Sequence, residues 1–120
     1  MTSRASVGFF GLIDKEVCTN QGFISIIPKS EHSRMYILHN LMLRREEIIG
    51  LAKGTTYKEI NKTTFRSMDI IMPNKMLLKQ FYDFSYDIIR HTRLLKKQTV
   101  NLKAARDLLL PRLMSGEIVV

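Results

Sequence analysis

The sequence contains few of the residues that crosslink a chain or interrupt its elements. Of its 120 residues, one is cysteine, three are proline and none is tryptophan. A single thiol, Cys18, excludes an internal disulfide, and a thiolate metal site would need other kinds of ligand. No apolar run approaches the roughly 20 residues that cross a bilayer, and the first residues lack the basic start and sustained apolar core of a signal peptide. These absences predict a soluble intracellular protein with no membrane segment.

Catalytic signatures are absent as well. Residues 50–56, GLAKGTT, differ from a phosphate-binding loop because Lys53 precedes Gly54, whereas that motif needs Gly before Lys. There is no G-x-S-x-G, H-E-x-x-H, C-x-x-C or Asn-Pro-Pro-aromatic motif, and the three histidines lack local metal-ligand spacing. We interpret Cys18 as a buried, inert thiol. The sequence therefore predicts no catalytic residue and no metal site.

Positive charge is what the chain has in excess. Lys and Arg number 19 against 11 Asp and Glu, a net charge of +8. Residues 1–74 carry 10 basic and 7 acidic side chains, and residues 75–120 carry 9 and 4. This balance is typical of a protein that binds a polyanion. The basic residues of the C-terminal part are equally consistent with the solvated side of an amphipathic helix, or with a surface for an acidic protein partner.

Three short apolar runs indicate strands. Residues 7–13 (VGFFGLI) and 23–27 (FISII) are rich in β-branched and aromatic side chains, and residues 68–73 (MDIIMP) end at a proline. Between the second and third runs, apolar residues recur at helical spacing from Ser30, the predicted N-cap, to Gly54, the predicted C′ residue. We predict an α+β fold: a small mixed α/β module, residues 1–74, followed by one long coiled-coil-like helix in residues 75–120.

The long helix is predicted from an uninterrupted pattern. No Gly or Pro occurs in residues 75–110, and Asn74 is suited to cap the first turn. Pro111 should end the helix, because its ring opposes the carbonyl of Asp107 and it has no N–H to donate. A turn and a short apolar tail, residues 113–120, would follow.

Apolar side chains recur along this helix at steps of three and four, which is the pattern of a coiled-coil seam. His91 and Gln98 interrupt it. Polar seam residues set register and partner choice, although simple solvent exposure explains them equally well. The side chains predicted to bind a partner helix are Phe81, Phe84, Ile88, Leu95, Leu102 and Leu109.

Three polar clusters flank the predicted strands and helices: residues 2–5 (TSRA), 19–23 (TNQGF) and 54–65 (GTTYKEINKTTF). Arg bonds guanine, Asn and Gln bond adenine, and hydroxyls and lysines suit phosphates. Composition alone favours a different interpretation, in which these residues form turns and helix caps, with Asn61 capping a short helix. The side chains with nucleic-acid chemistry are Ser3, Arg4, Asn20, Gln21, Thr55, Thr56, Tyr57, Lys58, Asn61 and Lys62.

Four segments in order, TSRASVG, TNQGF, GTTYKEIN and RDLLLPRLMSGEI, carry a family resemblance. Together they resemble the latter part of a target-recognition domain, plus one conserved long helix, of the DNA-specificity subunit of type I restriction-modification enzymes. The resemblance covers residues 2–120. It implies a non-catalytic chain in the prokaryotic cytoplasm that binds double-stranded target DNA and positions a separate adenine methyltransferase subunit. No cofactor is implied for this chain, since S-adenosylmethionine would bind to the methyltransferase.

The resemblance also assigns roles to the parts of the chain. The polar loops become candidate DNA contacts, and the long helix, with residues 106–118 at its end, becomes the spacer and the methyltransferase-binding surface. A family subunit has two recognition domains and two antiparallel helices, whereas this sequence supplies part of one domain and one helix. We therefore expect a homodimer through the long helix, with a restriction subunit as a further partner in complete systems. The alternative is a truncated subunit that binds and stabilises the methyltransferase without reading DNA.

Overall fold

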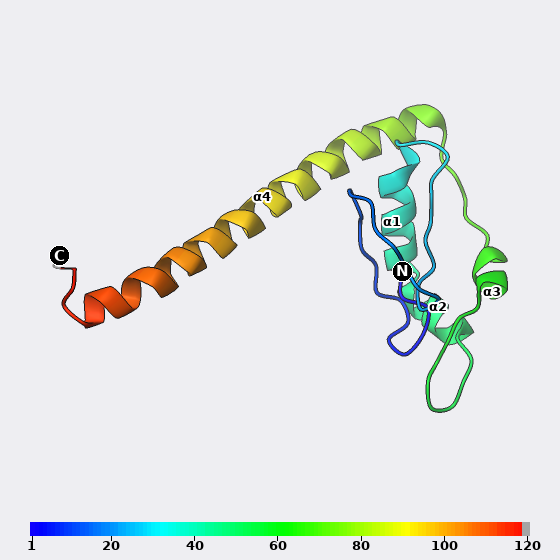
Figure 1. Ribbon diagram of the computed structural model, residues 1–120. Coiled ribbons are helices and arrows are strands. Elements are labelled where there is room, and N and C mark those ends of the chain that lie inside the picture. Colours follow the sequence, from blue (N-terminus) through cyan, green and yellow to red (C-terminus); the bar gives the residue numbers. More distant parts are fainter. Residues whose placement is uncertain (119–120) are drawn as a thin grey trace. The chain divides into compact units, whose positions relative to one another are not determined.

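The structure, a computed structural model, describes residues 1–118 (Figure 1). It separates into two compact units, Met1–Asp83 and Phe84–Val120. The fourth helix contributes its first residues to the first unit and the remainder to the second. In the described residues the elements are α1 (Ser33–Leu43), α2 (Arg45–Leu51), α3 (Lys62–Arg66) and α4 (Lys75–Met114).

The predicted α+β fold is wrong, because residues 1–118 contain no sheet. Their β pairings are three isolated antiparallel bridges, Thr2 with Phe23, Arg4 with Glu59 and Lys53 with Glu59. The apolar runs 7–13, 23–27 and 68–73 have strand composition, but a strand forms only where a second segment completes a ladder beside it. Much of their apolar surface faces solvent instead, since Ile13 is 50% exposed and Ile27 is 89% exposed.

The core of the first unit forms where α1 and α2 meet the N-terminal segment and the segment before α3. Leu41 of α1 and Ile48 of α2 are 6% and 0% exposed, in agreement with the apolar pattern of the sequence. Burying an aliphatic side chain of this size contributes about 1.5–3 kcal/mol. The buried cluster consists of Val7, Ile24, Leu41, Ile48 and Ile60.

The single helix predicted between Ser30 and Gly54 is two helices. Helix α1 begins at Ser33, whose backbone N–H and Oγ both donate to the carbonyl of Ser30. The chain leaves helical geometry at Arg44 (φ −91°, ψ 19°) before α2 begins. Helix α2 ends at Leu51, and the following residue is extended. Gly54 is therefore not the C′ residue of this helix, as predicted, but belongs to the loop that follows.

The first turns of α4 pack on α1 within the first unit. Asn74 Oδ1 accepts the backbone N–H of Leu77 at 2.9 Å, which confirms the predicted cap. The Phe81 ring meets the rings of Tyr36 and His39 edge-on, with centroids 6.3 and 5.6 Å away. These contacts hold the start of the long helix against α1 in the first unit.

The predicted end of α4 at Pro111 is wrong, because the helix continues to Met114. A proline removes one hydrogen bond, but here the helix continues for about one more turn, and the carbonyls of Pro111, Arg112 and Leu113 accept bonds from the residues that follow. Gly116, at φ +73°, donates to the Leu113 carbonyl at 3.2 Å, and Glu117 donates to the Arg112 carbonyl at 3.0 Å. This pair of bonds is a Schellman motif. Of the predicted apolar tail, residues 119–120 lie outside the described residues.

Candidate nucleic-acid interface

The three predicted polar clusters meet in the first unit. The N–H of Ser3 donates to the Gly22 carbonyl at 2.8 Å, and the Ser3 carbonyl accepts from Ile60 at 2.9 Å. Ala5 donates to the carbonyl of Lys58 at 3.0 Å. Residues 2–5 therefore lie between the 19–23 turn and the 53–60 loop, held by single bridges. The fold thus gathers segments that are far apart in the sequence.

The 19–23 turn is built on Asn20. Its Oδ1 accepts the N–H of Gly22 at 2.9 Å, and its carbonyl accepts from Phe23 at 3.2 Å. This confirms the turn interpretation of TNQGF, and it leaves the exposed side-chain amide groups of Asn20 and Gln21 at the surface. Ser3 is only 3% exposed and its Oγ donates to the Gln21 carbonyl at 3.4 Å, so the Ser3 side chain supports the turn from beneath.

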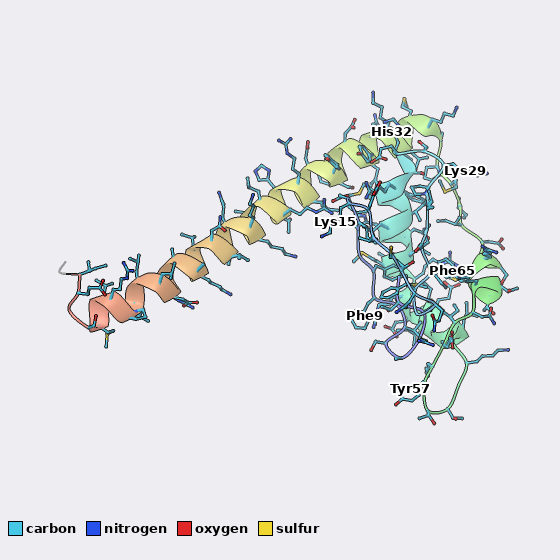
Figure 2. All side chains as sticks on the ribbon, viewed as in Figure 1. Phe9, Lys15, Lys29, His32, Tyr57 and Phe65 are labelled. Atoms are coloured by element: carbon cyan, nitrogen blue, oxygen red, sulfur yellow. The ribbon has the colours of Figure 1, made fainter. Side chains whose placement is uncertain are left out.

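The loop between α2 and α3 is closed by Lys53 and Glu59, whose backbone groups exchange two hydrogen bonds of 2.9 and 2.8 Å. Gly54 has φ +120°, and a Cβ there would lie 2.4 Å from the carbonyl oxygen of Tyr57. The closure of this loop therefore requires glycine. Figure 2 shows Tyr57 at the tip of the loop, where it is 74% exposed. The exposed residues 55–58, which include Thr55 and Thr56, are the four of the predicted DNA contacts that lie in this loop.

Helix α3 follows this loop and contributes two basic residues to the site. Asn61 Oδ1 accepts the N–H of Thr64 at 2.7 Å, which confirms the predicted cap and commits that oxygen to the helix. Lys62 begins α3, and Arg66 follows one turn later on the same face. Both basic residues and the 19–21 turn line one cleft of about 620 Å³.

No pattern in the sequence singled out Arg66 as a candidate site residue. It lies on the same face as Lys62 only because the two residues are one turn apart on α3, a helix of five residues. Arg4, which was predicted, lies against the turn, because its Nε is 3.4 Å from the position a Cβ would take on Gly22. In residues 1–118, none of Arg4, Lys58, Lys62 and Arg66 forms an ion pair. The cationic groups of the site are therefore free to meet an anion.

The predicted partner-binding residues divide between the two units. Phe81 is half-buried against α1 in the first unit. The others are exposed side chains of the second unit: Phe84 (68%), Ile88 (51%), Leu95 (58%), Leu102 (70%) and Leu109 (48%). The described residues of the second unit are the remainder of α4 and the turn after it, so within that unit no second helix packs against these apolar side chains.

Cys18 is exposed, where we expected a buried thiol. It lies in an irregular segment next to Val17, which is 48% exposed. Among residues 1–118, no three His, Cys, Asp or Glu side chains come together in a way that would hold a metal ion. Within that same range, no helix is both long and apolar enough to span a bilayer.

Comparison with known proteins identifies the class to which these features belong. The profile of the type I restriction modification DNA specificity domain matches residues 1–104. The chain therefore belongs to this family, which confirms the resemblance drawn from its four segments.

Two individual proteins of this family are similar to the chain. The HindI type I restriction enzyme specificity subunit of Haemophilus influenzae is 34% identical over 119 residues, which cover 95% of this chain and 26% of that subunit. The MjaIX specificity subunit of Methanocaldococcus jannaschii is 32% identical over 78 residues, 62% of this chain and 18% of its own length. The chain thus spans about a quarter or less of the relatives it matches. No solved structure matches it significantly.

Proposed function

We propose that this chain is a non-catalytic specificity element that binds double-stranded DNA and positions a separate adenine methyltransferase subunit on it. The observation that carries the proposal is the meeting of three polar clusters, residues 2–5, 19–23 and 54–62, on one unit of a chain that belongs to the DNA specificity family. Residues that serve only as separate turns and caps have no need to converge.

The chemistry of the gathered residues suits DNA. Arg4 and Gln21 have side chains suited to bidentate bonds with base edges, Asn20 has its amide nitrogen as a donor because its Oδ1 already accepts from Gly22, and Lys58 and Lys62 suit phosphate oxygens. The cations lack acidic partners in residues 1–118, so DNA binding would not first have to break an ion pair. The capping interpretation is compatible with this role, because Asn20 and Asn61 use their Oδ1 atoms locally and hold neighbouring side chains outward.

The second unit supplies the partner surface in this proposal. Ile88, Leu95, Leu102 and Leu109 recur every seven residues, and such a repeat drifts by about 20° per heptad on a straight helix. A second helix that follows the drift gives a left-handed coiled coil. We assign this seam to pairing with a second copy of the chain, which would supply two recognition units. The methyltransferase, with its S-adenosylmethionine, and a restriction subunit in complete systems would bind the assembled specificity element.

A second candidate function is binding and stabilising the methyltransferase without reading DNA. The observation in its favour is that the recognition unit has isolated bridges in place of a sheet, with apolar residues such as Ile27 turned to solvent. A recognition surface built on few contacts would hold its base-reading groups less rigidly.

The two functions differ in how the assembled complex binds DNA. The affinity of the methyltransferase for duplex DNA should be measured with and without this chain over a range of salt concentrations. Each phosphate neutralised by the chain adds about −0.9 to the slope of log affinity against log salt. With the chain present, we expect a higher affinity for DNA and a steeper fall of that affinity with salt. Identical binding in its absence would leave the second function, and methyl transfer by the isolated chain would contradict both.

A further inference from the structure

We propose that the cleft between the 19–23 turn and helix α3 is the groove that holds the DNA phosphates, with Lys62 and Arg66 as the phosphate-binding side chains. This inference rests on the proposed function and deepens it, since it moves the main backbone contact from the tip of the 54–58 loop to the cleft. Arg66 becomes a DNA contact.

The arrangement of the cations is the first support. Lys62 and Arg66 are one turn apart on α3, so their side chains extend from the same face and both line the cleft. Both are exposed and neither has an acidic partner in residues 1–118. The binding groups are these side chains and not the N-terminus of α3, where the Asn61 side chain already takes the Thr64 N–H.

The opposite wall supplies neutral polar groups. Asn20 and Gln21 present amides there, and the hydroxyls of Thr19 and Ser25 lie 3.4 Å apart beside them. Side chains of these types are frequent partners of phosphate and sugar oxygens. Phe23 and Phe65, with Ile24 and Ile26, add apolar surface to the lining that is suited to the carbon face of a sugar. Figure 2 labels Phe65 on α3.

The charge of the lining distinguishes this cleft from the other surfaces of the first unit. No Asp or Glu lines it, whereas the apolar cleft beside α1 is lined by Glu31 as well as Lys15 and Arg34. The tip of the 54–58 loop offers one cation, Lys58, followed directly by Glu59. A polyanion strand is therefore best accommodated beside α3, where two cations act without a nearby carboxylate on the same wall.

The test is a comparison of two charge-matched double variants. Lys62→Gln with Arg66→Gln removes the two cations of the cleft, and Lys75→Gln with Lys79→Gln removes two cations at the same spacing at the start of α4, outside the cleft. Glutamine keeps a long side chain and good helix propensity, so α3 should remain folded, as circular dichroism would verify. Binding of each variant, assembled with the methyltransferase, to a random-sequence DNA duplex is measured as a function of salt.

We expect the cleft variant to reduce the salt slope by about 1.8, which corresponds to two phosphate contacts, and the α4 variant to leave the slope nearly unchanged. Equal slopes for the two variants, with wild-type binding intact, would overturn the cleft assignment and leave the proposed function standing. A wild-type chain that contributes nothing to DNA binding would overturn both. If the α4 variant loses more of the salt slope than the cleft variant does, the phosphates bind at the start of α4 and the cleft assignment is wrong.

Discussion

At the scale of single residues, Gly54 decides whether the loop after α2 can close. Its φ of +120° is a conformation that side chains rarely adopt, and an added Cβ would lie 2.4 Å from a backbone oxygen. We therefore expect Gly54→Ala to destabilise the protein by about 1–3 kcal/mol, as is usual for strained backbone positions. The urea unfolding midpoint measures this effect, and hydrogen exchange of the Lys53 and Glu59 amides should report the opened loop.

Gly50 provides the matched control. It lies inside α2, and nothing is within 4 Å of the position of an added Cβ. Gly50→Ala should stabilise the protein by about 0.5–1 kcal/mol, because alanine loses less backbone freedom than glycine in a helix. The two identical substitutions should thus have opposite signs. A Gly54→Ala variant as stable as wild type would contradict the loop geometry.

At the scale of elements, the junction of α1 and α2 depends on Arg44. Its guanidinium donates to the Glu47 carboxylate through two bonds of 2.7 Å and to the Asp69 carbonyl at 2.6 Å. The hydrogen bond from Arg44 lowers the pKa of Glu47, and the same bond raises the pKa of Arg44. The separate bond from Arg44 to the Asp69 carbonyl joins the helix junction to the segment between α3 and α4.

This pair predicts a pH dependence with a definite sign. Because the pKa of Glu47 is lower in the folded than in the unfolded state, its contribution is complete above the unfolded value of about 4.5 and is lost as the pH falls through the folded value. The pair is at the surface, so the effect should be small. Urea midpoints of wild type and Glu47→Gln should differ at neutral pH and converge as the pH falls below the folded pKa of Glu47. A difference that persists in acid would contradict the assignment.

The helix caps were predicted correctly from the sequence, whereas the places where helices break or end were not. Asn61 and Asn74 act as N-caps as the sequence predicts, because a cap involves residues only three positions apart. The break at Arg44 was not predicted, since the sequence there contains no Gly or Pro, and the Arg44 side chain bonds to the Asp69 carbonyl in a distant segment. Pro111 was expected to end α4, but the turn that ends it is completed by Gly116.

At the scale of the whole molecule, the proposed assembly depends on the apolar seam of α4. Leu95→Asp with Leu102→Asp places two charges on positions that are 58% and 70% exposed in the single chain and buried in a coiled coil. We expect these changes to abolish dimerisation and to weaken methyltransferase binding by at least about tenfold, or roughly 1.4 kcal/mol. Sedimentation velocity and co-purification measure the two effects.

Lys96→Gln with Lys103→Gln is the control for this experiment. It changes the net charge by the same amount at the same spacing, but each lysine lies one position beyond a seam residue and so points away from the partner. This variant should assemble like wild type. A wild-type chain that remains monomeric, both alone and with the methyltransferase, would contradict the seam proposal.

The sequence by itself determined the features that depend on near neighbours: the caps at Asn61 and Asn74, the apolar pattern that buries Leu41 and Ile48, the long helix, and the four ordered segments that identify the family. The tertiary structure alone decided the features that need distant partners. Residues 7–13 and 23–27 have strand composition, yet they form no sheet because no neighbouring segment completes a ladder with them in residues 1–118. The same dependence on distant contacts brings the Asn20 turn beside Arg66 of α3, and so creates a cleft that no local pattern in the sequence reveals.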